Sequence, residues 1–200
     1  MDLFTAIEAR RAIKHYSSNE TVSEADFERI MQAVLLSPTS YNIQHWRFVR
    51  VTDPQQRSRI QEAAWGQTQI TEAAELIILC ADTQAWSDDP QRYWANTNAE
   101  VQSVMLPMLQ AFYEGKGQLQ RDEALRSSGM AAQTLMLAAK ALGYDTCPMI
   151  GFDSEQVARI INLPAGHLIS MIITLGKADR PANPRAGQLP LEEVLLENSY

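Results

Sequence analysis

The stretch Ser37–Arg50, with the sequence SPTSYNIQHWRFVR, joins two regular elements around which the rest of the chain is organised. A helical pattern ends at Leu36, and Trp46 and Phe48 open a run that is typical of a β-strand. The loop between them offers hydroxyls, an amide and free backbone N–H groups, and binding sites usually lie on such loops. The alternative is an ordinary helix-to-strand connection, because Ser, Thr, Asn and Pro are the commonest turn residues. Two further stretches, described below, favour the binding site.

Composition indicates one globular domain. The chain has 200 residues, of which 46% are hydrophobic and 20% charged, which is enough for one sizeable core. Its formal net charge of −7 argues against a nucleic-acid partner, since phosphate backbones need clustered Lys and Arg. The acidic residue Asp2 and the lack of a long apolar run argue against a secretory signal and against a membrane-spanning segment. Cys80 and Cys147 lack metal-ligand spacing, so we expect reduced core cysteines, no metal site and a cytoplasmic protein.

A cluster of cations lies near the N-terminus, where Arg10, Arg11 and Lys14 fall within five residues of an acidic protein. Arg supplies a two-pronged donor and Lys a point charge, so the functional interpretation is a clamp for a phosphate or a carboxylate. For any single one of these side chains, a solvated basic turn is the simpler interpretation.

Periodicity predicts several helices and about four strands. Helices are expected at 2–10, 23–36, 54–65, 90–114, 122–142 and 154–163, and strands at 47–52, 76–81 and 168–176. The apolar run 76–81 should be an interior strand, and the helix 122–142 should run through the middle of the fold. Pro107 should kink the helix 90–114, and Gly115 and Gly117 should end it. Because βαβ alternation is missing, the order indicates an α+β fold with one small sheet.

The last two dozen residues change character. Pro181, Pro184 and Pro190 fall within ten positions, so 179–188 cannot form regular structure. Beyond them, Leu191 and Val194 begin another apolar stretch. An extended arm with an apolar end must dock somewhere, and we expect another subunit to accept it.

The common catalytic motifs are missing: the chain has no GxSxG elbow, no HExxH and no Walker loop. Gly115-Lys116-Gly117 lacks the third glycine of a dinucleotide fingerprint and follows a helix, not a strand. His15, His45 and His167 are not spaced as metal ligands, and we expect surface or capping histidines. If the protein is an enzyme, its reactive group comes from outside the chain.

Five segments together carry a resemblance to a known family. They are Arg10–Lys14, the loop Ser37–Phe48 with Asn42, Gln44 and Trp46, the turn Gly66–Gln69, the helix Gly129–Asp145, and Pro148–Asp153. In this order and spacing the chain resembles the FMN-dependent nitroreductase family from Met1 to Tyr200. The resemblance implies a nitroreductase-like α+β fold, with a small central, mostly antiparallel sheet flanked by helices. It also implies a long central helix and an extended C-terminal arm that embraces the partner subunit.

The resemblance further implies a homodimer with an active site at the interface. Each site would hold FMN non-covalently and take electrons from NADH or NADPH in a ping-pong cycle. The flavin atom N5 would supply the chemistry, so no protein side chain would be catalytic. A bound phosphate carries about −1.5 to −2 charges, which fits a basic cluster in an acidic protein. The implied partner is a small-molecule electron acceptor, with no nucleic acid and no membrane.

The implied site residues fall into groups along the chain. Those near the phosphate or the pyrimidine edge of the flavin are Arg10, Arg11, Ala12 and Lys14, with Arg185 closing on the phosphate. Those reaching the flavin of the neighbouring subunit are Pro38, Thr39, Ser40 and Asn42, with Tyr41 as a wall of the substrate slot. Those contacting ribityl or ring atoms are Gln67 and Gln69. Those lying against the isoalloxazine are Pro148, Met149, Ile150 and Gly151, with the N–H of Ile150 or Gly151 near N5.

Three functions stay open at this point. The first is an FMN-dependent NAD(P)H oxidoreductase that acts on nitroaromatics, quinones or similar small acceptors. The second is a reductase of one metabolite, such as a semialdehyde or an enone, on the same fold. The third is a non-catalytic flavin-binding dimer. The sequence alone does not decide the acceptor, the choice between NADH and NADPH, or whether one or two electrons pass.

Overall fold

A four-stranded antiparallel sheet forms the centre of the protein in the computed structural model, which describes residues 1–200. Its strands are β1 (Trp46–Arg50), β2 (Glu75–Asp82), β3 (Asp145–Met149) and β4 (His167–Gly176), in the order β1-β2-β4-β3. The three strands expected from periodicity are confirmed to within two residues. β2 is buried along its whole length, as its apolar run predicts, and β1 and β3 form the two edges.

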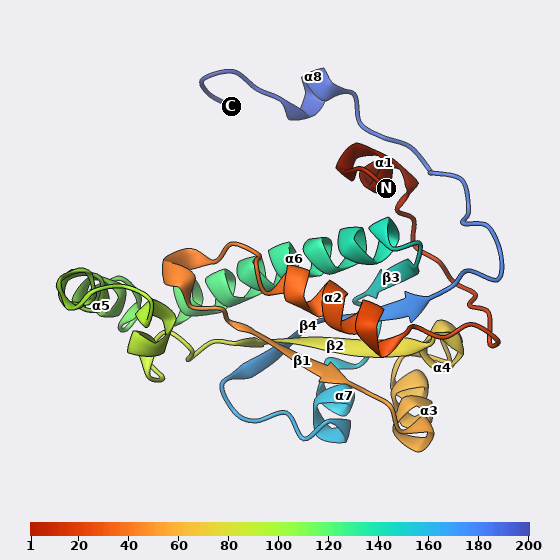
Figure 1. Cartoon of the computed structure of the whole chain (residues 1–200), viewed down its shortest axis with the longest axis horizontal. Coiled ribbons are helices and arrows are strands. Elements are labelled where there is room, and N and C mark those ends of the chain that lie inside the picture. The colour runs from red at the N-terminus through yellow and green to blue at the C-terminus, as the bar shows by residue number, and fades with distance from the viewer.

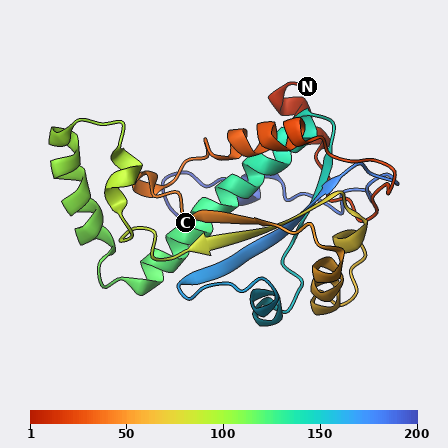
Figure 2. The same cartoon turned by 60° about the horizontal axis from the view of Figure 1, so that its bottom comes forward.

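Helices cover both faces of this sheet. They are α1 (Leu3–Ala9), α2 (Glu24–Val34), α3 (Pro54–Ala63), α4 (Gln69–Glu72), α5 (Ala99–Tyr113), α6 (Gly117–Ala141), α7 (Ser154–Ile160) and α8 (Leu191–Val194), with the 3₁₀ turns η1 (Ser40–Asn42) and η2 (Pro90–Trp94). Figure 2 shows α2 and α6 above the sheet and α3 and α7 below it. In Figure 1, η2 and α5 project beyond one end of the sheet. The predicted α+β class with a long central helix is therefore confirmed.

Two apolar clusters hold the layers together, because alternate residues of a strand point to opposite faces of a sheet. Ile77 and Leu79 of β2 pack with Leu135 of α6 on one face. Leu76 and Ile78 pack with apolar residues of α3 and α7 on the other. The helix α6 contacts α1, α2 and all four strands, so it runs through the middle of the fold as expected.

Two helix boundaries differ from the sequence-based expectation. The segment 90–114 is not one helix, because η2 and α5 are separate and the side chain of Asn98 caps the start of α5. Pro107 lies inside α5. Gly115, with a φ of +72°, follows the end of α5, but Gly117 is the first residue of α6 and does not end a helix.

The tail beyond β4 runs over the outside of the molecule. Residues 181–190 contain no helix or strand, as the prolines predict, and only the short helix α8 follows. Figure 1 shows this tail arching past α1 and ending away from the body of the fold. The apolar side chains of Leu191, Val194 and Leu195 are exposed. None of the helices combines the length and the apolar character that crossing a bilayer requires.

Candidate functional site

A cavity of about 440 Å³ brings the N-terminal cations together with the tail. Its lining consists of Arg10, Arg11, Ala12, Lys14, Pro148 and residues 183–188. Four of the lining residues are cations, Arg185 being the fourth, and none is an acid, although the chain has a net charge of −7. The cavity is therefore a locally positive site that suits a phosphate or a carboxylate.

Backbone pairing with the sheet fixes the basic segment 10–14. The N–H of Ile13 donates to the carbonyl oxygen of Thr146 at 3.1 Å, and Ala12 forms a parallel bridge with Thr146. This segment therefore lies along the outer edge of β3. Ile13 is buried, whereas Ala12 and Lys14 on either side of it are exposed, as alternation along an extended segment requires.

The tail closes the other side of the cavity within the same chain. A guanidinium nitrogen of Arg185, Nη2, donates to the carbonyl oxygen of Glu8 at 3.0 Å and to that of Arg10 at 3.4 Å. In the opposite direction, Arg11 donates to the carbonyl oxygen of Asn183. These contacts hold residues 183–188 against the end of α1, and they place Arg185 beside the N-terminal cations.

The segment that follows β3 offers backbone donors beside Pro148. Ile150 is 80% exposed, and the N–H groups of Ile150 and Gly151 donate no hydrogen bond within the chain. Gln67 Nε2 donates to the carbonyl oxygen of Gly151 at 2.7 Å, and Gln69 Nε2 donates to Gln67 Oε1 at 3.0 Å. The structure therefore brings both glutamines together with Gly151.

The loop 37–45 has an unusual backbone. Tyr41, Asn42 and Gln44 have φ values of 51°, 56° and 54°, which lie in the left-handed region. Such conformations cost about 1–3 kcal/mol each in residues other than glycine, and they cluster at functional sites. The side chain of Asn42 donates to the carbonyl oxygen of Tyr93 in η2 at 2.7 Å, which ties the loop to the neighbouring helical segment.

Side chains of this loop differ in what they face. The hydroxyl of Thr39 lies 3.0 Å from Ser127 Oγ in α6, so it is used inside the chain. Pro38 is exposed and Ser40 is half-buried. Tyr41 is half-buried, with its ring centroid 5.7 Å from that of Phe112.

The expected site residues thus form two groups on one chain. The cavity and the segment after β3 lie at one edge of the sheet, and the loop 37–45 directly precedes β1 at the other edge. None of the loop residues lines the cavity.

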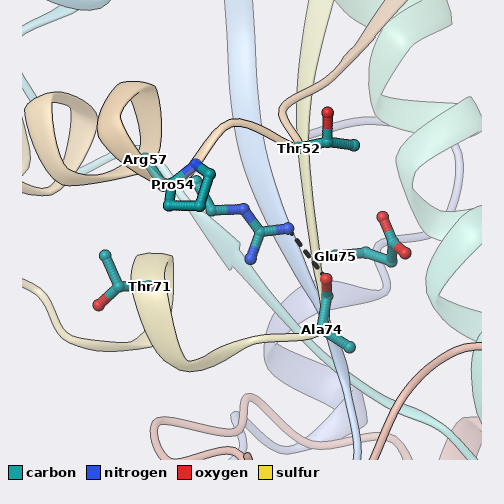
Figure 3. A pocket seen from close by; sticks show the side chains of 6 residues that line it. All are labelled: Thr52, Pro54, Arg57, Thr71, Ala74 and Glu75. Atoms are coloured by element: carbon teal, nitrogen blue, oxygen red, sulfur yellow. Dashed lines mark hydrogen bonds between the residues drawn. The ribbon is translucent and has the colours of Figure 1, made fainter.

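Another cavity, of about 280 Å³, is a structural feature (Figure 3). The guanidinium of Arg57 donates to the carbonyl oxygens of Val51, Ala73 and Ala74 at 2.8, 2.6 and 2.9 Å, and so ties α3 to the segments flanking β1 and β2. Glu75 on its far side forms an ion pair with an arginine of β1. Both charged groups are therefore used within the chain, and we assign no ligand to this cavity.

Comparison with known families decides the relationship of this chain. The model described as the nitroreductase family matches residues 7–177. The chain belongs to the nitroreductase family.

Individual relatives extend this nitroreductase match along nearly the whole chain. Protein DrgA of Synechocystis sp. is 46% identical over 200 residues, which cover 98% of this chain and 95% of that protein. The NADH dehydrogenase of Thermus thermophilus is 32% identical and covers 98% of this chain and 96% of its own length. Among solved structures, a protein of Exiguobacterium sibiricum crystallised in complex with FMN has a TM-score of 0.88 at 26% identity. That match covers 98% of this chain and 96% of the solved chain.

One expectation about this nitroreductase-family protein is wrong. His45 is fully buried and not a surface or capping histidine, because the loop folds it inward between the buried residues Ile43 and Trp46. Its burial lowers the pKa of His45 to about 4. The signal available in the sequence was the nearness of two large apolar residues, Ile43 two positions before it and Trp46 directly after it.

Sequence reasoning also passed over two polar residues of α6. Glu123 and Ser127 are buried and lie one helical turn apart, and Ser127 faces Thr39 of the loop. Their i, i+4 spacing in a helix with a broad apolar face was the signal that could have found them.

Proposed function

We propose that this protein is an FMN-dependent oxidoreductase that takes a hydride from NADH or NADPH. Electrons then pass, in a ping-pong cycle, to nitroaromatics, quinones or similar small acceptors. The observation that carries the proposal is the acid-free cavity lined by four cations, next to the unpaired N–H groups of Ile150 and Gly151. The Exiguobacterium sibiricum relative that was crystallised with FMN supports it.

The residues present fit an FMN molecule. The cavity volume of about 440 Å³ lies within the range of roughly 300–1,000 Å³ that is usual for small-molecule sites. A phosphate with about −1.5 to −2 charges needs cations around it, and Arg10, Arg11, Lys14 and Arg185 supply them. No carboxylate of the lining competes for these cations.

Each group has a distinct task in this proposal. The cations Arg10 and Lys14 bind the phosphate, while the half-buried Gln67 faces the ribityl chain or the ring. Gln69 is buried and orients Gln67 by donating to its Oε1. The N–H groups of Ile150 and Gly151 donate to the ring edge near N5 and so orient it. The flavin, when bound, supplies the hydride chemistry, and the chain therefore needs no acid–base side chain of its own.

We infer that the protein acts as a homodimer. Large apolar side chains are exposed on α1, after α2 and in the tail, with Phe4 at 75%, Leu36 at 86% and Leu191 at 67%. Such a number of exposed apolar residues favours a covered surface. A dimer would also unite the two groups of expected site residues, with the loop 37–45 of one subunit reaching the flavin of the other through Pro38, Ser40 and Asn42, and with Tyr41 beside the acceptor.

We also propose a cytoplasmic location, where NADH and NADPH are supplied. The buried, unpaired thiols Cys80 and Cys147 are consistent with a reducing compartment.

A visible spectrum of the freshly isolated protein tests the proposed function. We expect the bands of an oxidised flavin, bleaching by NADH or NADPH without oxygen, and recovery on adding a quinone or nitroaromatic acceptor. A colourless protein that gains no flavin from added FMN would overturn the proposal. Comparable kcat/KM values across many acceptors would favour an oxidoreductase of broad specificity. A kcat/KM that is much higher for one acceptor would favour a metabolite reductase. FMN binding without NAD(P)H turnover would indicate a non-catalytic flavin-binding protein. Sedimentation measures the oligomeric state.

A further inference from the structure

A series of four buried or half-buried polar side chains, joined by hydrogen bonds, connects α6 to the loop 37–45. Glu123 Oε1 lies 3.2 Å from Ser127 Oγ, and Ser127 Oγ lies 3.0 Å from Thr39 Oγ1. Thr39 Oγ1 in turn lies 3.3 Å from His45 Nδ1. Ser127 and His45 are fully buried, and Glu123 is 8% exposed. The cofactor cavity at the other edge of the sheet includes none of these residues.

The number of available protons fixes the direction of each hydrogen bond in this series of four side chains. Glu123 also forms an ion pair with Arg126, and a carboxylate paired in this way only accepts hydrogen bonds. Ser127 must therefore donate its one hydroxyl proton to Glu123, and it accepts from Thr39. Thr39 has then used its proton, so it accepts from His45, which must carry its proton on Nδ1.

The surroundings of His45 agree with this tautomer. Its other ring nitrogen, Nε2, is buried and has no hydrogen-bond partner in the chain. In the Nδ1–H form this nitrogen is a lone-pair acceptor, whereas the alternative form would leave a buried N–H donor unpaired. Orphaned buried N–H groups are rarer in proteins than under-satisfied acceptors. The charged groups that act on the ring are Glu123, Asp82 and Arg47.

We propose that Glu123 is a positioning residue of this protein. Through Ser127 and Thr39 it holds His45 in the Nδ1–H tautomer, and it thereby fixes the loop 37–45 in its left-handed conformation. The part of this inference that concerns the cofactor rests on the proposed function, because the loop is the segment that we place against the flavin of the neighbouring subunit.

The tautomer tests the inference directly, by ¹⁵N and ¹³C NMR of the imidazoles in the full chain near pH 7, with His45→Gln to assign the signals. We expect His45 of the natural protein to be the Nδ1–H form. Glu123→Gln keeps the size of the side chain but adds a donor, so both tautomers should be populated. Ser127→Ala should have the same effect.

A neighbouring residue supplies the matched control. Ser128 is also fully buried in α6, but its hydroxyl donates to the carbonyl oxygen of Ala124 at 2.9 Å in its own helix. Ser128→Ala should therefore leave the His45 signals as they are. An Nδ1-deprotonated His45 in the natural protein, or an equal effect of Ser127→Ala and Ser128→Ala, would overturn the inference. If Ser127→Ala does not fold, Glu123→Gln alone decides, because it changes no volume.

Cofactor affinity provides the second readout. If this series of hydrogen bonds fixes the loop, Ser127→Ala and Glu123→Gln should each raise the FMN dissociation constant about three- to tenfold, which is the effect of one hydrogen bond. Ser128→Ala should not change it. Equal FMN affinities of Ser127→Ala, Glu123→Gln and the natural protein would refute the link to the loop. A protein that binds no FMN at all would refute the proposed function, while the tautomer result, obtained without flavin, would still stand.

Discussion

The buried imidazole of His45 predicts a specific loss of stability in acid. Its pKa is lowered to about 4 by burial, against 6.5 for an ordinary histidine. The unfolded chain therefore binds a proton between pH 6.5 and 4 that the folded chain refuses. Each unit of pKa corresponds to about 1.4 kcal/mol, so the contribution of His45 to the free energy of unfolding should fall by about 3 kcal/mol. It is complete above pH 6.5 and is lost as the pH falls toward 4.

Urea denaturation at several pH values between 7.5 and 4 measures this effect. Carboxylates also titrate in this range, so the quantity of interest is the difference between the natural protein and His45→Gln. That difference should change by about 3 kcal/mol in favour of the variant as the pH falls. His15→Gln is the comparison, because His15 is exposed and lies 3.6 Å from a carboxylate oxygen of Glu72; this variant should gain no advantage over the natural protein as the pH falls. Parallel curves for His45→Gln, or an NMR titration of His45 with a midpoint near 6.5, would refute the reasoning.

Three further predictions concern affinity and stability. Lys14→Ala should raise the FMN dissociation constant, measured by fluorescence titration, by roughly 10- to 150-fold, because a charge-assisted contact contributes about 1.5–3 kcal/mol. The control is Arg59→Ala, which removes an exposed cation outside the cavity. Equal dissociation constants for the two variants would mean that the phosphate binds elsewhere. Arg57→Met should lower the free energy of unfolding by about 2–4 kcal/mol, since three carbonyl oxygens lose their donor. Arg59→Met on the same helix should change the urea midpoint little. Gly166→Ala should destabilise by about 1–2 kcal/mol, because its φ is +79° and a Cβ would lie 2.9 Å from a neighbouring side chain; equal melting temperatures for this variant and Gly187→Ala, where the space is open, would contradict the prediction.

Most of the fold could be predicted from the chain because its strands and helices carry strong periodic signals. The continuous apolar run of β2 is buried on both faces of the sheet. Apolar residues surround much of the circumference of α6, and this helix packs against all four strands. The boundaries near α5 could not be predicted in the same way. Asn98 is one polar residue among several in that region, and only its contact with the N–H of Val101 reveals it as a cap. Gly117 lies two positions after Gly115, and the sequence around the two glycines does not show which of them ends a helix and which begins one.

The candidate site was predictable where charge marks it and hidden where polar groups are buried. The cations Arg10, Arg11 and Lys14 stand out in an acidic sequence, and the structure brings Arg185 to them. The contact between Thr39 and Ser127 spans 88 positions, and no local pattern reports such a long-range pairing. For the same reason, the inward orientation of the Thr39 hydroxyl could only be seen in the folded chain.

The path of the tail has a consequence for how the protein matures in the cell. One wall of the basic cavity comes from residues 10–14 and the opposite wall from 183–188. A ribosome makes the first wall long before it makes the second. A nascent chain that still lacks residues 183–188 therefore carries only one of the two walls, and the cavity exists only after the tail has folded back onto the N-terminal segment.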